Sequence, residues 1–386
     1  MKEIIGKRFD EVFDLQMGKT PDRKNTLYFE GDNVWVSIRD MSNKDICESQ
    51  EHISDDAIVN CAIKKVKAGT VIMSFKLTVG KCAIAAVDLY TNEAIMAFNL
   101  KDGYYIDSSF LYYYLQSYKW QGANKAVMGL TLNKATISKQ IISIPPLPIQ
   151  QKIVAELDTV CLIIDKKKQQ LKELDKLAQA IFYDMFGDPV ENEKGWEVKK
   201  LEEIVSETCS ISYGIVQPGD GVEEGVPIVR PIDMSETFVY RTGLKQTTKE
   251  ISDSYKRTIL KGDEILLCVR GTTGVVALAS PELKECNVTR GITPITCNKQ
   301  NNRCFIYSQL KMNSVQQYIA DYTKGIALKQ INMSDVRKIP LIVPPLSLQQ
   351  SFATKIEAIE KQKELISRSI KEAQTLFDER MDYWFD

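Results

Sequence analysis

The phrase "IPPLPIQQ" at residues 144–151 returns almost unchanged as "VPPLSLQQ" at residues 343–350. A duplicated phrase of this kind indicates an internal repeat, which has to be recognised before a fold is assigned. Each copy is followed by a long polar segment without internal proline or glycine, residues 148–186 and 347–385. Proline and glycine are the residues that interrupt helices, so both segments are predicted to be long helices.

Weaker matches precede each copy in the same order. The stretch "KAGTVIMSFKLTVGKCAIA" (67–85) matches "LKGDEILLCVRGTTGVVALA" (260–279), and "GLTLNKATIS" (129–138) matches "GIALKQINMS" (325–334). The chain is therefore predicted to run as globule, helix, globule, helix, with an α/β (α+β) fold in each globule. The predicted domains are a first globule at 1–147, a first helical segment at 148–190, a second globule at 191–343 and a second helical segment at 344–386.

Both helical segments carry an apolar stripe with alternating spacings of three and four residues, which is typical of a coiled coil. Ser347 and Gln350 predict a capping box, Pro148 suits a first helical turn, and Gly187 predicts the end of the first helix. Each helix would be roughly 58 Å long. The predicted seam consists of Ile153, Leu157, Val160, Ile164, Leu171, Leu174, Ile181, Phe352, Ile356, Ile359, Ile366, Ile370 and Phe377.

An apolar stripe of this length must pack against another apolar surface, and the stripe of the other helical segment in the same chain is the nearest candidate. The first globule leads into the start of the first helix and the second globule leaves from its end, and domain termini often lie close together. The helices are therefore expected to be antiparallel, giving a pseudo-two-fold rod with a globule at each end. The alternative is that the helices pack onto one compact core or onto another chain.

Composition limits the class of protein. The chain is 44% hydrophobic and 26% charged, with a formal net charge of −1, as is usual for a soluble globular protein. Its nine cysteines include no C-x-x-C pair, so neither a disulfide framework nor a zinc knuckle is indicated. The start of the chain lacks the apolar core of a signal peptide, and no apolar run is long enough to cross a membrane. We expect a cytoplasmic protein without a membrane partner.

The usual catalytic motifs are missing from the sequence. His52, the only histidine, lies in the polar stretch "ICESQEHISDD" (46–56), so a histidine-based triad is unsupported, and an H-E-x-x-H metal site, which needs two histidines, is excluded. No phosphate-binding loop is present; "RGTTG" (270–274) lies between two apolar runs and is predicted to be a turn, and its repeat partner "KLTVG" (76–80) lacks the first glycine. We therefore expect no catalytic, cofactor-binding or metal-binding residues in this chain.

Two globules separated by a rod suggest a protein that holds two recognition domains at a set distance. Bipartite DNA sites have this geometry, because two modules approach grooves separated by about one helical turn, roughly 34–36 Å, or a multiple of it. The slightly negative net charge does not favour DNA binding. A domain whose net charge is close to zero can still bind DNA if its basic residues cluster or if partner proteins supply most of the phosphate contacts.

The whole chain resembles the specificity subunit of a Type I restriction-modification system. The resemblance rests on the two proline-glutamine phrases that open long helices, on the stretch "GTVIMSFKLTVGKCAIA...TNEAIMAF" (69–98), and on "MGKTPD" (17–22) followed by "VWVSIRDM" (34–41). It implies two target recognition domains, each reading half of an asymmetric bipartite site in double-stranded DNA, and an antiparallel helix pair that sets the spacer. It also implies two methyltransferase subunits that carry S-adenosylmethionine, and restriction subunits that add a motor and a nuclease.

Reading DNA requires side chains that reach base edges, such as Arg to guanine and Asn or Gln to adenine, and polar loops that contact phosphates. Lys166, Lys167 and Lys168 point in different directions on a helix and are expected to be solvated, although Lys167 interrupts the apolar seam and is a candidate for setting its register. The candidate DNA-binding residues are Lys19, Thr20, Arg39, Asn43, Lys76, Lys81, Lys125, Asn133, Tyr213, Gln217, Arg230, Arg270, Thr272, Arg290, Lys324, Lys329 and Gln330.

Two other functions remain open at this point. A coiled-coil scaffold whose globules bind proteins would show no dependence on DNA sequence, even with methyltransferase partners present. A single-chain methyltransferase would need an adenine-pocket loop of the "NPPY" type and a glycine-rich cofactor loop, whereas Pro145–Pro146 follows Ile144 and Pro344–Pro345 follows Val343.

Overall fold

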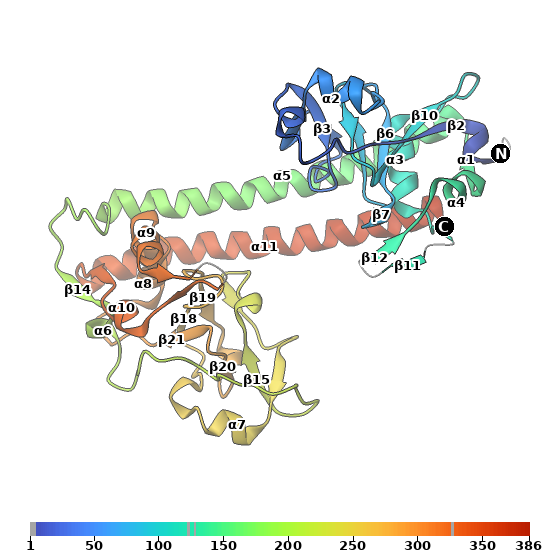
Figure 1. The fold of residues 1–386 in the computed structure, drawn as a ribbon. Coiled ribbons are helices and arrows are strands. Elements are labelled where there is room, and N and C mark those ends of the chain that lie inside the picture. The colour runs from blue at the N-terminus through green and yellow to red at the C-terminus, as the bar shows by residue number, and fades with distance from the viewer. Residues whose placement is uncertain (1–4, 122–123, 127–128, 326–327) are drawn as a thin grey trace. The chain divides into compact units, whose positions relative to one another are not determined.

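Two helices of 40 residues each, α5 (Leu147–Phe186) and α11 (Leu346–Phe385), confirm the helices predicted at 148–186 and 347–385 (Figure 1). The computed structural model describes residues 5–121, 124–126, 129–325 and 328–386. It divides into unit 1, residues 1–166 and 370–386, and unit 2, residues 167–369. Each unit therefore contains one globule and a part of each long helix. In the described residues, no helix is long and apolar enough to cross a membrane.

Unit 1 is built on a five-stranded sheet in the order β2-β10-β6-β8-β4 and a three-stranded sheet in the order β5-β3-β9. Smaller sheets pair β1 with β13 and join β11, β12 and β7. Its strands are β1 (Ile5–Arg8), β2 (Phe13–Met17), β3 (Asn33–Val36), β4 (Asp45–Ile46), β5 (Glu51–Ile53), β6 (Val71–Ser74), β7 (Lys76–Leu77), β8 (Cys82–Ala85), β9 (Tyr90–Thr91), β10 (Ile95–Leu100), β11 (Asn124–Ala126), β12 (Gly129–Thr131) and β13 (Ile141–Ile144). Its shorter helices are α1 (Phe9–Val12), α2 (Asp55–Asn60), α3 (Ser108–Ser117) and α4 (Lys134–Lys139).

Unit 2 repeats most of this plan, with sheets in the orders β16-β19-β18-β21 and β17-β15-β20 and the pairs β14-β24 and β22-β23. Its strands are β14 (Val198–Lys200), β15 (Val226–Val229), β16 (Phe238–Val239), β17 (Lys245–Thr247), β18 (Ile265–Cys268), β19 (Val276–Ala279), β20 (Asn287–Val288), β21 (Ile292–Ile295), β22 (Thr323–Lys324), β23 (Gln330–Ile331) and β24 (Pro340–Ile342). Its shorter helices are α6 (Leu201–Ile204), α7 (Lys249–Asp253), α8 (Arg303–Leu310), α9 (Asn313–Asp321) and α10 (Met333–Arg337).

Strand directions show that the repeat is structural. The hairpin β6-β8 in unit 1 corresponds to β18-β19 in unit 2, since both pairs are antiparallel and both gain a third antiparallel strand, β10 or β21. β3 and β15 each have one antiparallel and one parallel neighbour. The predicted order of globule, helix, globule, helix is confirmed, and so is the turn predicted at 270–274, which connects β18 and β19.

The first glutamine of each repeated phrase explains why the phrase occurs twice. Gln150 is fully buried, and its side-chain oxygen accepts a hydrogen bond from the backbone N–H of Asp107 at 2.8 Å. Its amide group donates to the carbonyl of Pro145, also at 2.8 Å. Asp107 is in turn the N-cap of α3, accepting from the backbone N–H groups of Ser109 and Phe110. Gln150 therefore ties the start of the long helix to the start of a core helix.

Gln349 repeats the arrangement in unit 2. It is fully buried, accepts from the backbone N–H of Asn302 at 2.8 Å and donates to the carbonyl of Pro344 at 2.8 Å, while Asn302 is the N-cap of α8. The predicted capping box of Ser347 with Gln350 is wrong, because α11 already begins at Leu346 and Ser347 lies within its first turn. The buried glutamine holds this helix start instead.

The other end of α5 follows the prediction. Gly187 has φ +76°, a left-handed conformation that glycine adopts without steric cost, and its N–H donates to the carbonyl of Tyr183 at 2.9 Å. The final turns enter the core of unit 2, where Phe182 and Phe186 pack against Phe305 of α8 and Phe352 of α11 with ring centroids 4.9–5.5 Å apart.

The predicted seam residues have two environments. Those near the start of each long helix belong to the core of a globule: Ile153 and Leu157 pack with α3, and Phe352, Ile356 and Ile359 pack with α8. Seven seam residues are buried, namely Ile153, Leu157, Val160, Ile164, Phe352, Ile356 and Ile359. The remaining six are half-buried, namely Leu171, Leu174, Ile181, Ile366, Ile370 and Phe377. The stripe thus anchors each globule and also joins the two helices.

Within each unit, charged contacts show that the two long helices are antiparallel. In unit 1, Arg380 of α11 forms an ion pair with Glu156 of α5, and the indole N–H of Trp384 donates to Glu156 at 3.1 Å. In unit 2, the ammonium group of Lys363 lies 2.8 Å from the carboxylate of Asp175. The ammonium group of Lys152 lies over the ring of Trp384 in unit 1, and Phe182 packs against Phe352 in unit 2. Within each unit, residue numbers on α11 therefore fall as those on α5 rise.

Candidate nucleic-acid interface

Loops that are distant in the sequence meet at one end of the sheets in unit 2. Backbone N–H groups of Ile215, Thr289 and Val269 donate to the carbonyls of Val288, Val229 and Gly291 at 2.8, 2.9 and 2.7 Å, and that of Ile331 donates to Val269 at 3.0 Å. These bonds bring together five segments that we call loop cluster 2: residues 213–217, 229–230, 269–274, 289–291 and 328–331. Eight of the nine candidate residues predicted in the second globule lie in it directly: Tyr213, Gln217, Arg230, Arg270, Thr272, Arg290, Lys329 and Gln330.

The ninth candidate, Lys324, adjoins loop cluster 2. Gln330 forms a β-bridge with Arg270 and pairs with Lys324 in the hairpin β22-β23, while the N–H of Gly271 donates to the carbonyl of Lys329 at 2.8 Å. The side chains of Arg290, Lys324 and Lys329 are exposed and that of Arg270 is half-buried. Four cations therefore gather on loops whose backbones are tied together, although the net charge of the whole chain is slightly negative.

Unit 1 contains the same four backbone bonds. The N–H groups of Lys19, Asn92 and Phe75 donate to the carbonyls of Thr91, Val36 and Ala94 at 2.8, 3.0 and 2.9 Å, and that of Leu132 donates to Phe75 at 2.8 Å. These bonds bring together five segments that we call loop cluster 1: residues 18–20, 36–39, 75–80, 91–94 and 131–133. The candidates Lys19, Thr20, Arg39, Lys76 and Asn133 lie in it.

The remaining candidates of the first globule are placed as follows. Lys81 directly follows loop cluster 1, and its ammonium group donates to the carbonyl of Ile38 at 3.0 Å. Asn43 is exposed and precedes Lys44, whose ammonium group lies 2.6 Å from Asp158 of α5. Lys125 lies in β11, and its side chain is outside the part of the chain that the structure describes.

Several candidate side chains already have partners within the chain. Arg230 binds both carboxylate oxygens of Asp233, at 3.1 and 2.9 Å, and this hydrogen bonding raises the pKa of the Arg230 guanidinium. Thr20 donates to the carboxylate of Glu93, and Asn133 caps α4. Such residues shape the loops, whereas Lys19, Arg290 and Lys329, whose side chains are exposed, are available to a ligand.

Two glycines that the sequence analysis did not single out hold the first loop of each cluster in place. A Cβ atom on Gly18 would lie 2.2 Å from the carbonyl oxygens of Thr91 and Asn92, and one on Gly214 would lie 2.1 Å from the carbonyl oxygen of Val288. Only glycine allows the chain to cross the end of the neighbouring strand this closely. The signal was present, since "MGKTPD" and "SYGIVQPGD" both place a glycine before a polar loop.

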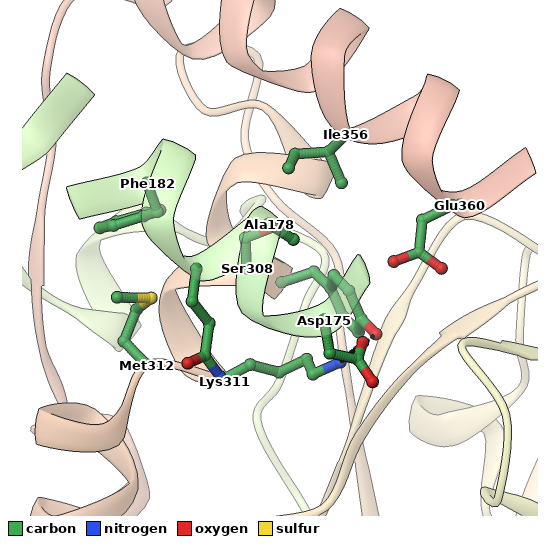
Figure 2. A pocket seen from close by; sticks show the side chains of 10 residues that line it. Asp175, Ala178, Phe182, Ser308, Lys311, Met312, Ile356 and Glu360 are labelled. Atoms are coloured by element: carbon green, nitrogen blue, oxygen red, sulfur yellow. Dashed lines mark hydrogen bonds and ion pairs between the residues drawn. The ribbon is translucent and has the colours of Figure 1, made fainter. Parts of the chain in front are cut away.

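A cavity of about 190 Å³ in unit 2 lies between α5, α8 and α11 (Figure 2). Figure 2 shows the ammonium end of Lys311 beside the carboxylate of Asp175. Lys363 contacts both Asp175 and Glu360, at 2.8 and 3.0 Å. Burial lowers the pKa of Lys363, but the hydrogen bond to Asp175 and the charge of Glu360 outweigh it, so that the pKa is raised overall.

The charged groups around this cavity neutralise one another. Two ammonium groups and two carboxylates are paired, so the cavity offers neither an activated nucleophile nor a free general base. Among the described residues, no group of three or more His, Cys, Asp or Glu side chains could hold a metal ion. The polar contact at Lys363 is of the kind that sets the register of a helix pair, the role considered above for Lys167.

Comparisons with known proteins agree with this architecture. A chain from Methanocaldococcus jannaschii, the Type I restriction enzyme MjaIX specificity subunit, is 25% identical over 385 residues, covering 92% of this chain and 86% of the relative. The Type I restriction enzyme EcoBI specificity subunit of Escherichia coli is 24% identical over 267 residues, covering 63% of this chain and 56% of the relative.

Solved structures share the fold. The S subunit of a Type I restriction-modification system from M. genitalium superposes with a TM-score of 0.55 at 14% identity, covering 99% of this chain and 96% of that one. A chain from work on complex assembly and conformational transition of the type I R-M system gives 0.58 at 15% identity, covering 100% and 98%. The family model for the Type I restriction modification DNA specificity domain matches residues 1–176 and 193–375. The chain therefore belongs to the family of Type I restriction-modification DNA specificity proteins.

Proposed function

We propose that loop clusters 1 and 2 each read one half of an asymmetric bipartite DNA sequence and that this chain performs no chemistry itself. One observation carries the proposal: four matched backbone hydrogen bonds build the same loop arrangement in both units, yet the side chains on the loops differ. Lys19 corresponds to Ile215, Lys76 to Arg270 and Ala94 to Gly291. A common scaffold with different side chains is what two different half-sites require, since base edges are distinguished by the donors and acceptors that face them.

The helix pair would set the distance between the half-sites and receive the methyltransferase subunits. Both long helices carry large apolar side chains that remain exposed in this chain. Leu162 and Ile163 of α5 are 53% and 42% exposed, and Leu365 and Leu376 of α11 are 61% and 46% exposed. Apolar side chains on the surface of a helix favour a protein partner. In this proposal S-adenosylmethionine is bound by two methyltransferase subunits, and restriction subunits join the same complex.

The test is to co-express this chain with the methyltransferase subunit and map methylated adenines across the host DNA by long-read sequencing. We expect one asymmetric motif split by a gap of fixed length. Exchanging residues 1–143 for those of another family member should change one half of the motif and leave the other half and the gap unchanged. A stable complex whose methylation does not depend on this chain would refute the proposal.

A further inference from the structure

The turns at 74–80 and 268–274 share backbone features but differ in sequence, including at a position where one has leucine and the other glycine. In both turns the last residue of the strand donates across the turn: the N–H of Ser74 bonds to the carbonyl of Lys81 and that of Cys268 to the carbonyl of Val275, at 2.8 Å in each case. Gly80 and Gly274 have φ values of +89° and +93°. At the third residue of the loop the first unit has Leu77 at φ +67°, where the second has Gly271 at φ +85°.

Leucine at this position is unfavourable in the free protein for two reasons. The left-handed conformation brings Cβ close to the following carbonyl oxygen, which glycine avoids. The side chain is also 53% exposed, so a large part of its apolar surface is in water. Strained residues of this kind cluster at binding sites, where a ligand offsets their cost.

The surroundings of Leu77 indicate which ligand group it meets. Its neighbour Lys76 is a cation in loop cluster 1, and Phe75 is the residue whose backbone bonds to Ala94 and Leu132 hold that cluster together. Leu77 therefore lies on the surface that would face DNA. Among the base edges of the major groove, the methyl group of thymine is the apolar feature that leucine can contact.

We propose that Leu77 contacts a thymine methyl group and gives the half-site of unit 1 a preference for thymine that Gly271 does not give to the half-site of unit 2. This inference rests on the proposed function. It assigns a specificity-determining role to a residue that neither donates nor accepts hydrogen bonds through its side chain.

The test uses the complete complex of this chain with its methyltransferase subunits, on duplexes that contain the mapped motif. Each thymine in the motif is replaced in turn by deoxyuridine, which lacks only the methyl group. The wild-type complex should bind one of these duplexes about fourfold to fivefold more weakly, the size expected for losing one methyl contact. The L77G complex should bind the unmodified duplex with the same reduced affinity and should no longer distinguish thymine from deoxyuridine at that position.

Two controls separate specificity from folding. The L77G chain should have an unchanged or raised melting temperature, because relief of the left-handed strain opposes the greater unfolded-state freedom of glycine. The variant L27A changes another leucine of unit 1, which is 64% exposed and lies outside loop cluster 1, and should keep wild-type discrimination. Discrimination that survives in L77G, or a wild-type complex indifferent to every thymine methyl, would overturn the inference alone. A wild-type complex without any sequence preference would overturn the proposed function as well.

Discussion

The duplicated glutamines allow a sharp test of how the repeat is held together. Gln349 is fully buried, whereas the next residue, Gln350, is exposed. In Q349A the backbone N–H of Asn302 and the carbonyl of Pro344 both lose a partner that lies 2.8 Å away. Each buried polar group without a partner costs about 1–3 kcal/mol, so we expect the start of α11 to lose about 3 kcal/mol of stability. Q350A should change stability by less than about 0.5 kcal/mol.

Native-state hydrogen exchange followed by mass spectrometry measures this loss locally. Peptides that cover the first turns of α8 and α11 should exchange about 100-fold faster in Q349A than in the wild type, since every 1.4 kcal/mol corresponds to about a factor of ten. Q150A and Q151A form the same matched pair in unit 1, where Gln150 is buried and Gln151 is exposed. Equal exchange rates in Q349A and Q350A would refute the role assigned to the buried glutamine.

Three further predictions concern the helix pair and the loop clusters. Hydrogen bonding to Arg380 lowers the pKa of Glu156 from its ordinary value of 4.5. E156Q should therefore be less stable than the wild type by about 1 kcal/mol above pH 4.5, and this difference should vanish as the pH falls through the lowered pKa. Urea titrations in which the wild type and E156Q differ in stability by the same amount at every pH would contradict this. R290A should weaken DNA binding and reduce the slope of log K against log salt by about 1, whereas R257A, which changes an exposed arginine outside loop cluster 2, should leave the slope unchanged. Removing one heptad from the middle of each long helix should either shorten the recognised spacer by about 10 Å, which is about three base pairs, or abolish binding. A variant that binds the original spacer with full affinity would refute the proposal that the helix pair sets the spacer length.

The long helices and the repeat were predictable because their signals are local and long. A long apolar stripe without internal proline or glycine specifies a helix whatever it packs against, and both ends of the first helix agree with Pro148 and Gly187. The capping box at Ser347 failed for a tertiary reason. The side chain of Gln349 instead binds the carbonyl of Pro344, just before the helix, and the N–H of Asn302 at the start of α8, 47 residues away in sequence.

The sequence by itself determined the order of globules and helices, the apolar stripe and the turn at 270–274, because periodicity, proline and glycine act on neighbouring residues. It identified residue types suited to DNA, but not which of them remain available. Only the tertiary structure decided that Arg230 is engaged by Asp233 while Arg290 and Lys329 are exposed on one loop cluster. It also decided that Gly18 and Gly214 occupy the same place and that Leu77 adopts the conformation of Gly271. These features depend on backbone hydrogen bonds between segments far apart in the chain, and spacing along a single sequence does not contain them.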